Sequence, residues 1–457
     1  MALVLASVFA GAAPAVAAVP RGGDSFAIER NGYLLGQAPD WLDERNVVFH
    51  DPFLRDDGSD GQIHIHRSTL DGKKRKCLTC GLEGPNQVPV VQPNGKWILF
   101  HSWNGHNIRL GGAGFGGVGS DVWVMTRDGK RRTNLTKSSE LNDNFHAYWS
   151  PDGRHIVWTA LNWNEAEGGN GRSDVRVARF EPNGPGGPRL VDEHVVRPGN
   201  GHWYETQWWA PDGSGFLYTE TAGTAINPEL FFCRLPDPDR GRCRQSRLTR
   251  NLAWDEQAIF TPDMKRVIFM SSRKLRGGHD NWIRLANFLD LPARFDYLLI
   301  LPVFSDSFLQ PRLNQATDLY DQRLKWTRGR SAVRPIGPAR RLTRSGERGW
   351  IIPEFAWDPA GRRLLWTENK FPNELRIDQS CVMRKLREKF IRRLSDVDGL
   401  AELPFNLDRE IRKETTDLLQ DPSTFVGPEG CGGTQVDPDA QFKYEQRTRI
   451  GRYVPGR

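Results

Sequence analysis

The chain of 457 residues is poor in long hydrophobic runs, and after its first twenty residues none is long enough to cross a membrane as a helix. The best later candidate, FDYLLILPVF at 295–304, is short and is interrupted by Pro302. The first residues combine an apolar stretch with small residues at Ala15-Val16-Ala17, although no Lys or Arg precedes them. We therefore expect residues 1–18 to be a signal peptide and the mature protein to be periplasmic or secreted. A buried N-terminal strand or helix is the alternative.

No Gly-x-Ser-x-Gly sequence occurs anywhere in the chain. This motif carries the nucleophile of α/β-hydrolases, so its absence argues against a peptidase of that fold. The chain also has no stripe of basic residues with interleaved aromatics on one element, which argues against nucleic-acid binding. The formal net charge of +7 permits anionic partners but does not identify one.

Only six cysteines are present, an even number that fits disulfides in an exported chain. They fall into neighbouring pairs, and we predict bridges Cys233–Cys243 and Cys381–Cys431, with Cys77–Cys80 as a further structural pair. The Cys77-Leu78-Thr79-Cys80 sequence also leaves two alternatives open, a redox pair and half of a zinc site. A thioredoxin-like pair requires a βαβ context and a zinc site requires a second Cys or His pair, and neither is evident.

Glycine and proline, in contrast, are abundant, with 46 and 30 copies, which favours many turns and short strands. One element recurs: an aromatic residue, any residue, Pro-Asp-Gly, and an alternating apolar run. Proline fixes φ for a turn and glycine accepts positive φ, so each copy predicts two strands joined by a tight turn. The copies and close variants are VVQPNGKWILF (90–100), YWSPDGRHIVW (148–158), WWAPDGSGFLY (208–218), IFTPDMKRVIF (259–269) and AWDPAGRRLLW (356–366).

A second element, ending in Leu-Thr or a near relative, precedes each copy, and another strand pair such as DVWVMTRDGKRRTNLT (121–136) lies between them. One repeat is therefore four strands, and NVVFHDPF with IHIHRSTLDGKKRKCLT adds a sixth unit near the N-terminus. Four-stranded repeats predict an all-β fold, a six-bladed β-propeller over residues 40–370. The turn aromatics Trp149, Trp209, Phe260 and Trp357 are expected to pack between neighbouring blades.

These residues resemble the TolB-type repeat, a relative of the WD40 repeat, whose blades carry an aromatic-x-Pro-Asp-Gly turn and an x-Leu-Thr strand end. The resemblance covers roughly residues 40–370 and implies the propeller fold. It implies function only loosely, because such propellers serve as periplasmic adaptors, as gating domains of serine peptidases and as scaffolds of polysaccharide lyases.

Two regions depart from the repeat. The turn prolines Pro262 and Pro359 are 97 residues apart, which predicts a partly helical insertion in blade five at about 285–330. The C-terminal extension, 371–457, contains CVMRKLREKFIRRLSDV, whose apolar residues recur at helical spacing opposite a basic face. That face is expected to be solvated, with contact to an anionic membrane surface as the alternative. RTRIGRYV (447–454) is strand-like and is a candidate to return and close the ring.

The innermost strand of each blade lines the central channel, and here it precedes the turn. Five or six positions before the turn prolines, three successive blades place a carboxylate at the same mouth, with a histidine beside them. Tryptophans stand eight or nine positions before the same prolines. The predicted channel-mouth site therefore consists of His146, Glu205, Glu256, Glu354, Trp203, Trp254 and Trp350.

Carboxylates repel one another unless a cation joins them, and indoles stack on sugars or cationic groups. We therefore expect an exported, non-enzymatic protein that binds a peptide or glycan at this mouth without a resident cofactor. A divalent cation in the channel is one option. The bland alternative makes the tryptophans packing residues and the glutamates solvated. The enzymatic alternative is a metal-assisted polysaccharide lyase or hydrolase that uses the same histidine and glutamates, although no Arg or Lys stands nearby to hold an acidic sugar.

Two further metal motifs are weaker. His64 and His66 share one face of a predicted strand, which suits a metal, but no third ligand is identifiable in the sequence and surface histidines are commoner. DDGSDG (56–61) resembles the start of a calcium loop, but Arg67 stands where a bidentate Glu is required. We therefore do not expect calcium there.

Overall fold

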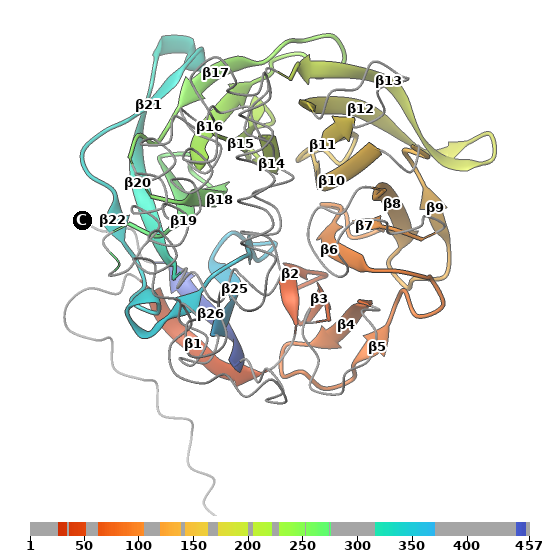
Figure 1. The fold of residues 1–457 in the computed structure, drawn as a ribbon, viewed down its shortest axis with the longest axis horizontal. Helices are drawn as coiled ribbons and strands as arrows, with labels where there is room; N and C mark the ends of the chain where they lie inside the picture. The colour runs from red at the N-terminus through yellow and green to blue at the C-terminus, as the bar shows by residue number, and fades with distance from the viewer. Residues whose placement is uncertain are drawn as a thin grey trace, which may run out of the picture.

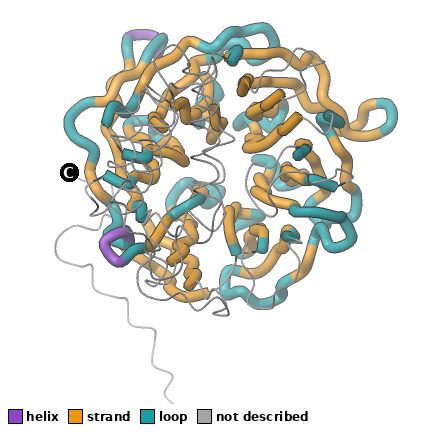
Figure 2. Tube along the Cα trace, viewed as in Figure 1, coloured by secondary structure: helices purple, strands orange, loops and turns teal. Residues whose placement is uncertain are grey.

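In a computed structural model of the protein, the strands form six antiparallel sheets arranged in a ring (Figure 1). Among the described residues strands dominate, and the only helices are the 3-10 turns η3 (Arg328–Arg330) and η4 (Gly346–Arg348) (Figure 2). No helix in this part of the chain is long and apolar enough to cross a membrane. The predicted six-bladed all-β propeller is confirmed. The structure describes residues 26–33, 36–51, 63–104, 119–138, 142–162, 172–199, 204–221, 228–251, 253–273, 275, 316–370 and 445–453.

Blades one to three each start on the innermost strand and run outward through consecutive strands. Blade one contains β2 (Gln37–Trp41), β3 (Asn46–His50), β4 (Ile65–Thr69) and β5 (Lys76–Cys77). Blade two contains β6 (Asn86–Val91), β7 (Trp97–Ser102), β8 (Asp121–Thr126) and β9 (Arg132–Asn134). Blade three contains β10 (Asn142–Trp149), β11 (His155–Asn162), β12 (Arg172–Gly184) and β13 (Gly187–Arg197).

Blades four and five follow the same order. Blade four contains β14 (Tyr204–Trp209), β15 (Gly215–Thr221), β16 (Pro228–Arg234) and β17 (Arg244–Arg247). Blade five contains β18 (Asp255–Phe260), β19 (Arg266–Ser271) and β20 (Asp318–Trp326), and both β21 (Val333–Pro335) and β22 (Arg340–Arg341) pair with β20.

The predicted insertion in blade five, at about 285–330, ends too late. β20 lies inside that range, yet it pairs with β19 from Ser271↔Asp318 to Arg266↔Arg323 and is the third strand of the blade. Burial of Leu319 and Tyr320 against the neighbouring strands stabilises β20 in this position. Residues 276–315 of the predicted insertion lie outside the described residues.

Blade six is built from both ends of the chain. β1 (Phe26–Tyr33) pairs with β26 (Glu445–Tyr453), which pairs in turn with β25 (Arg363–Lys370). β23 (Trp350–Ile351) and β24 (Phe355–Trp357) complete the sheet on the inner side. β26 contains most of the segment near the C-terminus that was predicted to be a strand. Among the described residues, the pairing of this C-terminal strand with the N-terminal strand β1 closes the ring.

The turn aromatics pack between neighbouring blades, as predicted. The indole N–H groups of Trp149, Trp209, Trp357 and Trp41 donate to backbone carbonyls of the preceding blade, those of Val90, Tyr148, Phe260 and Ala356. Phe260, which has no such donor, contacts the ring of Phe232 in blade four. The turn glycines Gly153 and Gly213 have φ of 67° and 72°, the conformation that the motif requires. One repeated motif therefore forms both the turn and the contact between blades.

The innermost strands share an irregularity that the sequence did not reveal. In blades one to five the register between the innermost strand and the next strand shifts once, which marks a β-bulge. In four of these blades a non-glycine residue at the bulge has positive φ, namely Ala38 (44°), Val88 (47°), His146 (50°) and Gln257 (41°). Such conformations cost about 1 to 3 kcal/mol each, and they gather where side chains must be re-aimed.

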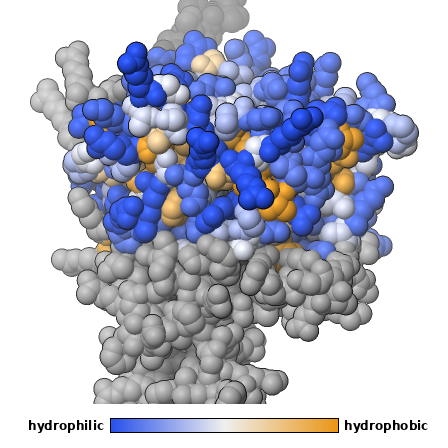
Figure 3. Space-filling view, turned by 90° about the horizontal axis from the view of Figure 1, so that it is seen from above, coloured by the Kyte–Doolittle hydropathy of each residue, from blue (hydrophilic) through white to orange (hydrophobic). Residues whose placement is uncertain are grey.

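Two disulfides are formed in the described residues, Cys77–Cys80 and Cys233–Cys243, and no described cysteine is free. The predicted bridge Cys381–Cys431, the predicted helix of the C-terminal extension and residues 1–18 lie outside the described residues. Seen from the side of the ring, the described surface is mainly hydrophilic, with apolar side chains in small separate patches (Figure 3). That side offers no broad apolar docking surface within the described residues.

Candidate functional site

One titratable side chain from each blade joins a continuous series around the channel, which we call the channel arc. His146 and Glu205 belong to the inner strands β10 and β14, and Glu256 belongs to β18. Glu354 precedes β24, and the structure adds two residues of second strands that sequence reasoning missed, His50 and His101. In blade order the arc consists of His50, His101, His146, Glu205, Glu256 and Glu354.

Neighbouring members of the arc interact pairwise. The rings of His101 and His146 have centroids 5.9 Å apart, and Nδ1 of His146 lies 3.1 Å from Oε1 of Glu205. Glu205 also accepts a hydrogen bond from Nε2 of Gln257 at 2.9 Å. The structure therefore brings four predicted site residues together, three glutamates and one histidine, and divides the arc into an imidazole half and a carboxyl half.

The carboxyl half contains a proton-sharing pair. The carboxyl of Glu256 hydrogen-bonds to that of Glu205, and two carboxyls can do so only when one of them holds a proton. Burial raises the pKa of Glu256, against the opposing effect of the hydrogen bonds from Glu205 and from Trp254. The indole N–H of Trp254 donates to Oε2 of Glu256 at 2.6 Å. One edge of this tryptophan is therefore fixed on the acid.

Glu354 is the most strongly perturbed of the described glutamates in the arc. Burial raises its pKa well above 4.5, and the charge of Glu256 raises it further. Among the described residues no basic group contributes to the pKa of either Glu256 or Glu354. Among the described residues no Lys or Arg forms an ion pair with these two acids. A cation bound in this half of the arc would therefore favour the ionised form of these acids and promote the loss of their protons.

The imidazole half supplies no positive charge to balance these acids. Burial lowers the pKa of His50 to about 4 and that of His146 to about 3. Burial also lowers the pKa of His101 well below 6.5, and the charges of His146 and His50 lower it further. All three rings are therefore neutral at pH 7. The strained backbone of His146 is held by blade four, because the hydroxyl of Thr206 donates to the His146 carbonyl.

Two aromatic residues occupy the centre of the ring beside the arc. Trp208, on β14, packs against three apolar clusters that belong to different sides of the ring. Its ring centroid lies 5.1 Å from that of Tyr148, on β10. Burial raises the pKa of Tyr148, and the charges of Glu354, Glu205 and Glu256 also raise it. The field of the carboxyl half therefore reaches across the channel to blade three.

The predicted tryptophans have different positions. Trp254 is partly buried and touches Glu256, as described above. Trp350 is buried in blade six, where the guanidinium of Arg447 lies 3.7 Å from its ring centroid and Lys370 lies 5.8 Å from it. Its ring is thus already engaged by this chain's own cations, and we do not include it in the site. Trp203 lies outside the described residues.

Metal ligands do not converge in the described part of the channel. Within the described residues only His64, Cys77 and Cys80 place three ligand atoms within 4.8 Å of one another, and they belong to blade one. The second histidine of the predicted strand pair, His66, instead binds Asp51, with Nε2 at 3.1 Å from the carboxylate. The carboxyl and imidazole groups of the arc are better suited to contact an organic cation than to form a ready-made metal site.

The sequence contained one indication of the two histidines that were missed. The second strand of blade one ends in Phe49-His50, and that of blade two contains Phe100-His101 one residue before its end. Both histidines pair with a glutamine of the inner strand, Gln37↔His50 and Gln87↔His101. The repeated dipeptide at one register position was the available clue.

The chain matches no known family model, and no curated protein sequence matches it significantly. Solved structures of similar fold include TolB from Acinetobacter baumannii, with 13% identity and a TM-score of 0.44, over 72% of this chain and 62% of that chain. A TolB structure from Agrobacterium tumefaciens gives 12% identity and a TM-score of 0.39, over 72% of this chain and 81% of that one. An oligogalacturonate lyase from Vibrio parahaemolyticus gives 12% identity and a TM-score of 0.32, over 50% and 59%.

Similarity at this level concerns the fold alone. The matched region spans less than two thirds of the Acinetobacter TolB chain. The six four-stranded blades of this chain, with their repeated turns, confirm the resemblance to TolB-like propellers in fold. The residues of the channel arc are therefore the basis for any proposal about activity and partners.

Proposed function

We propose that the protein is an exported, non-enzymatic binding propeller that holds a cationic group of a peptide partner in the carboxyl half of the channel arc. The observation that carries this proposal is the state of Glu256 and Glu354. Both are buried acids whose pKa values are raised by burial, and among the described residues no cation acts on either. A site of this kind gains most from a cation that the chain itself does not supply.

The chemistry favours an ammonium or a guanidinium. Either group donates several hydrogen bonds, and acceptors from Glu205, Glu256 and Glu354 stand on three successive blades. The indole of Trp254 adds an electron-rich surface beside the acids. Most glycan ends are neutral or acidic and would not relieve the repulsion between carboxylates. A peptide with a basic side chain or a free amino terminus fits better.

Two further observations support an exported binding protein. Disulfides persist in oxidising compartments, and two are formed here. The apolar N-terminal segment has the composition of a signal peptide. A hydrolytic role finds no support in the described channel, because neither a nucleophile elbow nor a set of three converging metal ligands is present there.

The test is binding of the mature protein to an array of basic peptides and their charge-neutral analogues, acetyl-lysine for lysine and citrulline for arginine. We expect binding that requires the positive charge and that falls about 100-fold when Glu256 and Glu354 are both changed to Gln. Glu193→Gln, which alters an exposed acid paired with Arg176, is the matched control and should not change binding. Equal binding of neutral peptides, or full binding by the double variant, would refute the proposal.

A further inference from the structure

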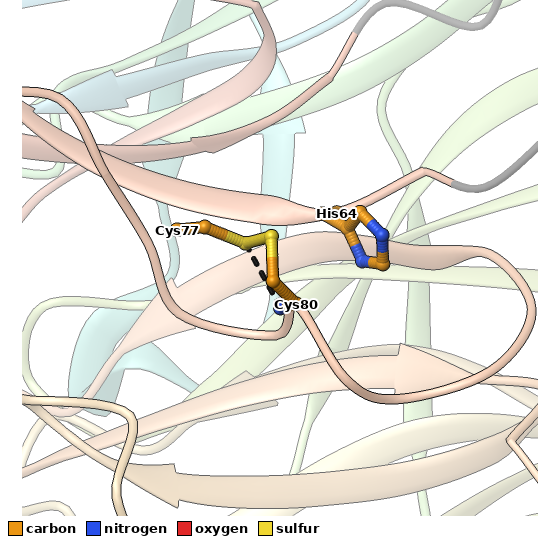
Figure 4. Close-up of side chains that lie close together, drawn as sticks. All are labelled: His64, Cys77 and Cys80. Carbon is orange, nitrogen blue, oxygen red and sulfur yellow. Dashed lines mark hydrogen bonds between the residues drawn. A yellow bond between two sulfur atoms is a disulfide. The ribbon is translucent and has the colours of Figure 1, made fainter. Parts of the chain in front are cut away.

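A second cluster of reactive side chains lies in blade one and has no part in the proposed peptide binding. His64, immediately before β4, faces the loop that carries Cys77 and Cys80 (Figure 4). One ring nitrogen of His64 and the two sulfurs lie within 4.8 Å of one another. Cys80 is exposed, whereas His64 and Cys77 are partly buried. A solvent-borne reductant and a metal ion can therefore both reach the cluster.

The backbone holds the two halves of the cluster together independently of the disulfide. The N–H of Leu78 donates to the carbonyl of Ile65 at 2.7 Å, and the N–H of Ile65 donates to the hydroxyl of Thr79 at 2.8 Å. His64 is fixed on its other side, because its carbonyl accepts from the N–H of Asp51 at 2.9 Å. The loop and the histidine therefore keep their places when the sulfur–sulfur bond is broken.

The surroundings favour the thiolate form of the reduced cysteines. The N–H of Cys80 points at the sulfur of Cys77, 2.9 Å away (Figure 4). The run Lys73-Lys74-Arg75-Lys76 stands immediately before Cys77 and is exposed. Hydrogen bonds and neighbouring cations both stabilise a thiolate, which is the form that binds metals.

We propose that blade one carries a redox-gated site for a thiolate-binding divalent ion such as Zn²⁺, with Cys77, Cys80 and His64 as its ligands. In the oxidised chain the two sulfurs are bonded to each other, 2.02 Å apart, and cannot serve as thiolate ligands. A dithiol reductant transfers two electrons and two protons to this bond, giving two cysteine thiols and the disulfide of the reductant. Zn²⁺ then displaces both thiol protons, and two thiolates balance its charge.

The geometry needed is close to the one present. Tetrahedral zinc with sulfur at about 2.3 Å and nitrogen at about 2.1 Å requires ligand atoms about 3.5 to 3.8 Å apart. The three atoms already lie within 4.8 Å, so reduction has only to let the sulfurs separate. Water completes the fourth position. His66 is not a ligand, because its ring binds Asp51 and stacks on Phe49 with centroids 5.9 Å apart.

The test uses the full-length protein with Cys233, Cys243, Cys381 and Cys431 changed to Ser, so that only one cysteine pair remains. A phosphine supplies the two electrons without adding a competing thiol, and Co²⁺ serves as the spectroscopic probe. We expect the reduced protein to bind one Co²⁺ with a thiolate-to-cobalt charge-transfer band, which Zn²⁺ abolishes. The oxidised protein should show no such band.

Two histidine variants make the test specific. His64→Ala should weaken Co²⁺ binding at least about tenfold, whereas His66→Ala, two residues further along the chain, should leave it unchanged. Circular dichroism of the reduced protein checks that blade one stays folded, as the backbone contacts require. The proposal is wrong if the reduced protein shows no thiolate band, if it loses its strand signal, or if His64→Ala binds Co²⁺ as tightly as the parent.

Discussion

Two groups of buried acids in this propeller differ in one respect. In the first group, which we call the paired acids, each carboxylate meets an arginine of the same chain. In the carboxyl half of the channel arc, Glu256 and Glu354 meet only other acids, an indole and a low-dielectric environment. The paired acids with their arginines are Glu220–Arg197, Glu229–Arg247, Asp255–Arg273, Asp318–Arg341, Asp321–Arg340, Asp358–Arg363 and Glu368–Arg449.

The contrast is sharpest between two adjacent residues. Asp255 and Glu256 are neighbours on β18, so their side chains point to opposite faces of the sheet. Asp255 is bound by Arg273 at 2.5 Å, whereas Glu256 turns to Glu205 and Trp254. The chain supplies an arginine to Asp255, and among the described residues it supplies no cation to Glu256. We take the missing cation to be what a ligand provides.

The largest effect is expected from breaking a paired acid. Asp321 accepts from Arg266 and Arg340 and from the hydroxyl of Tyr453 on the closing strand β26. Asp321→Asn leaves two arginines without their carboxylate and should lower the free energy of unfolding by about 3 to 5 kcal/mol in urea. Asp192→Asn, in an exposed pair with Arg179, is the control and should change it by less than about 1 kcal/mol. Equal losses in both variants would remove the distinction.

The same acid-to-amide change in the channel should lower peptide affinity without lowering the stability of the protein. Glu256→Gln removes one of three neighbouring acids, so its free energy of unfolding should be unchanged or slightly higher. Its affinity for the basic peptide should fall by about 2 kcal/mol, because the ligand's cation loses its partner. Urea unfolding and fluorescence anisotropy on one preparation measure both. A large loss of stability without loss of binding would place Glu256 among the paired acids.

The pH dependence of stability tests the state of Glu354. Burial and Glu256 raise the pKa of Glu354 above 4.5, so the folded protein holds a proton there that the unfolded chain has lost. Its contribution to stability is present below pH 4.5 and is lost as the pH rises through the raised pKa. As the pH rises from about 4.5, wild-type stability should therefore fall more steeply than that of Glu354→Gln. Parallel curves would contradict the assignment.

The smallest effect concerns two indole N–H groups. Trp254→Phe keeps an aromatic ring but removes the donor to Glu256, so peptide affinity at neutral pH should fall about three- to tenfold. Trp357→Phe removes the donor to the Phe260 carbonyl between blades five and six, and should lower stability by about 1 kcal/mol without changing affinity. Thermal melts and binding curves of both variants give the comparison. Identical profiles would mean that both indoles only pack the blades.

The fold was predictable because its information is local. Pro-Asp-Gly turns and their flanking aromatics specify each hairpin and each blade contact within a few residues, as Trp149 and Gly153 illustrate. The alignment of Glu205, Glu256 and Glu354 followed from the same repeat, because a fixed distance from the turn means a fixed level in the ring. The chain order alone therefore located the carboxyl half of the arc.

The features that the sequence did not predict depend on pairing between distant segments of the chain. His50 and His101 enter the arc through second strands, whose register with the inner strands includes a bulge. Trp350 is covered by Arg447, which belongs to β26, a strand of the same blade that is distant from Trp350 in the chain. β20 was assigned to an insertion because the long segment before it hides the strand period. Such contacts are set by strand pairing in the closed ring and have no local sequence pattern.

When a basic peptide binds, its cation should replace protons in the carboxyl half of the arc. Calorimetric titration of the basic peptide at pH 7, in two buffers of different ionisation enthalpy, measures the protons exchanged on binding. Because the pKa values of Glu256 and Glu354 are raised, we predict a net release of protons when the wild type binds the peptide. The Glu256→Gln, Glu354→Gln double variant should release none in any residual binding. Peptide binding by the wild type without proton release would contradict the account.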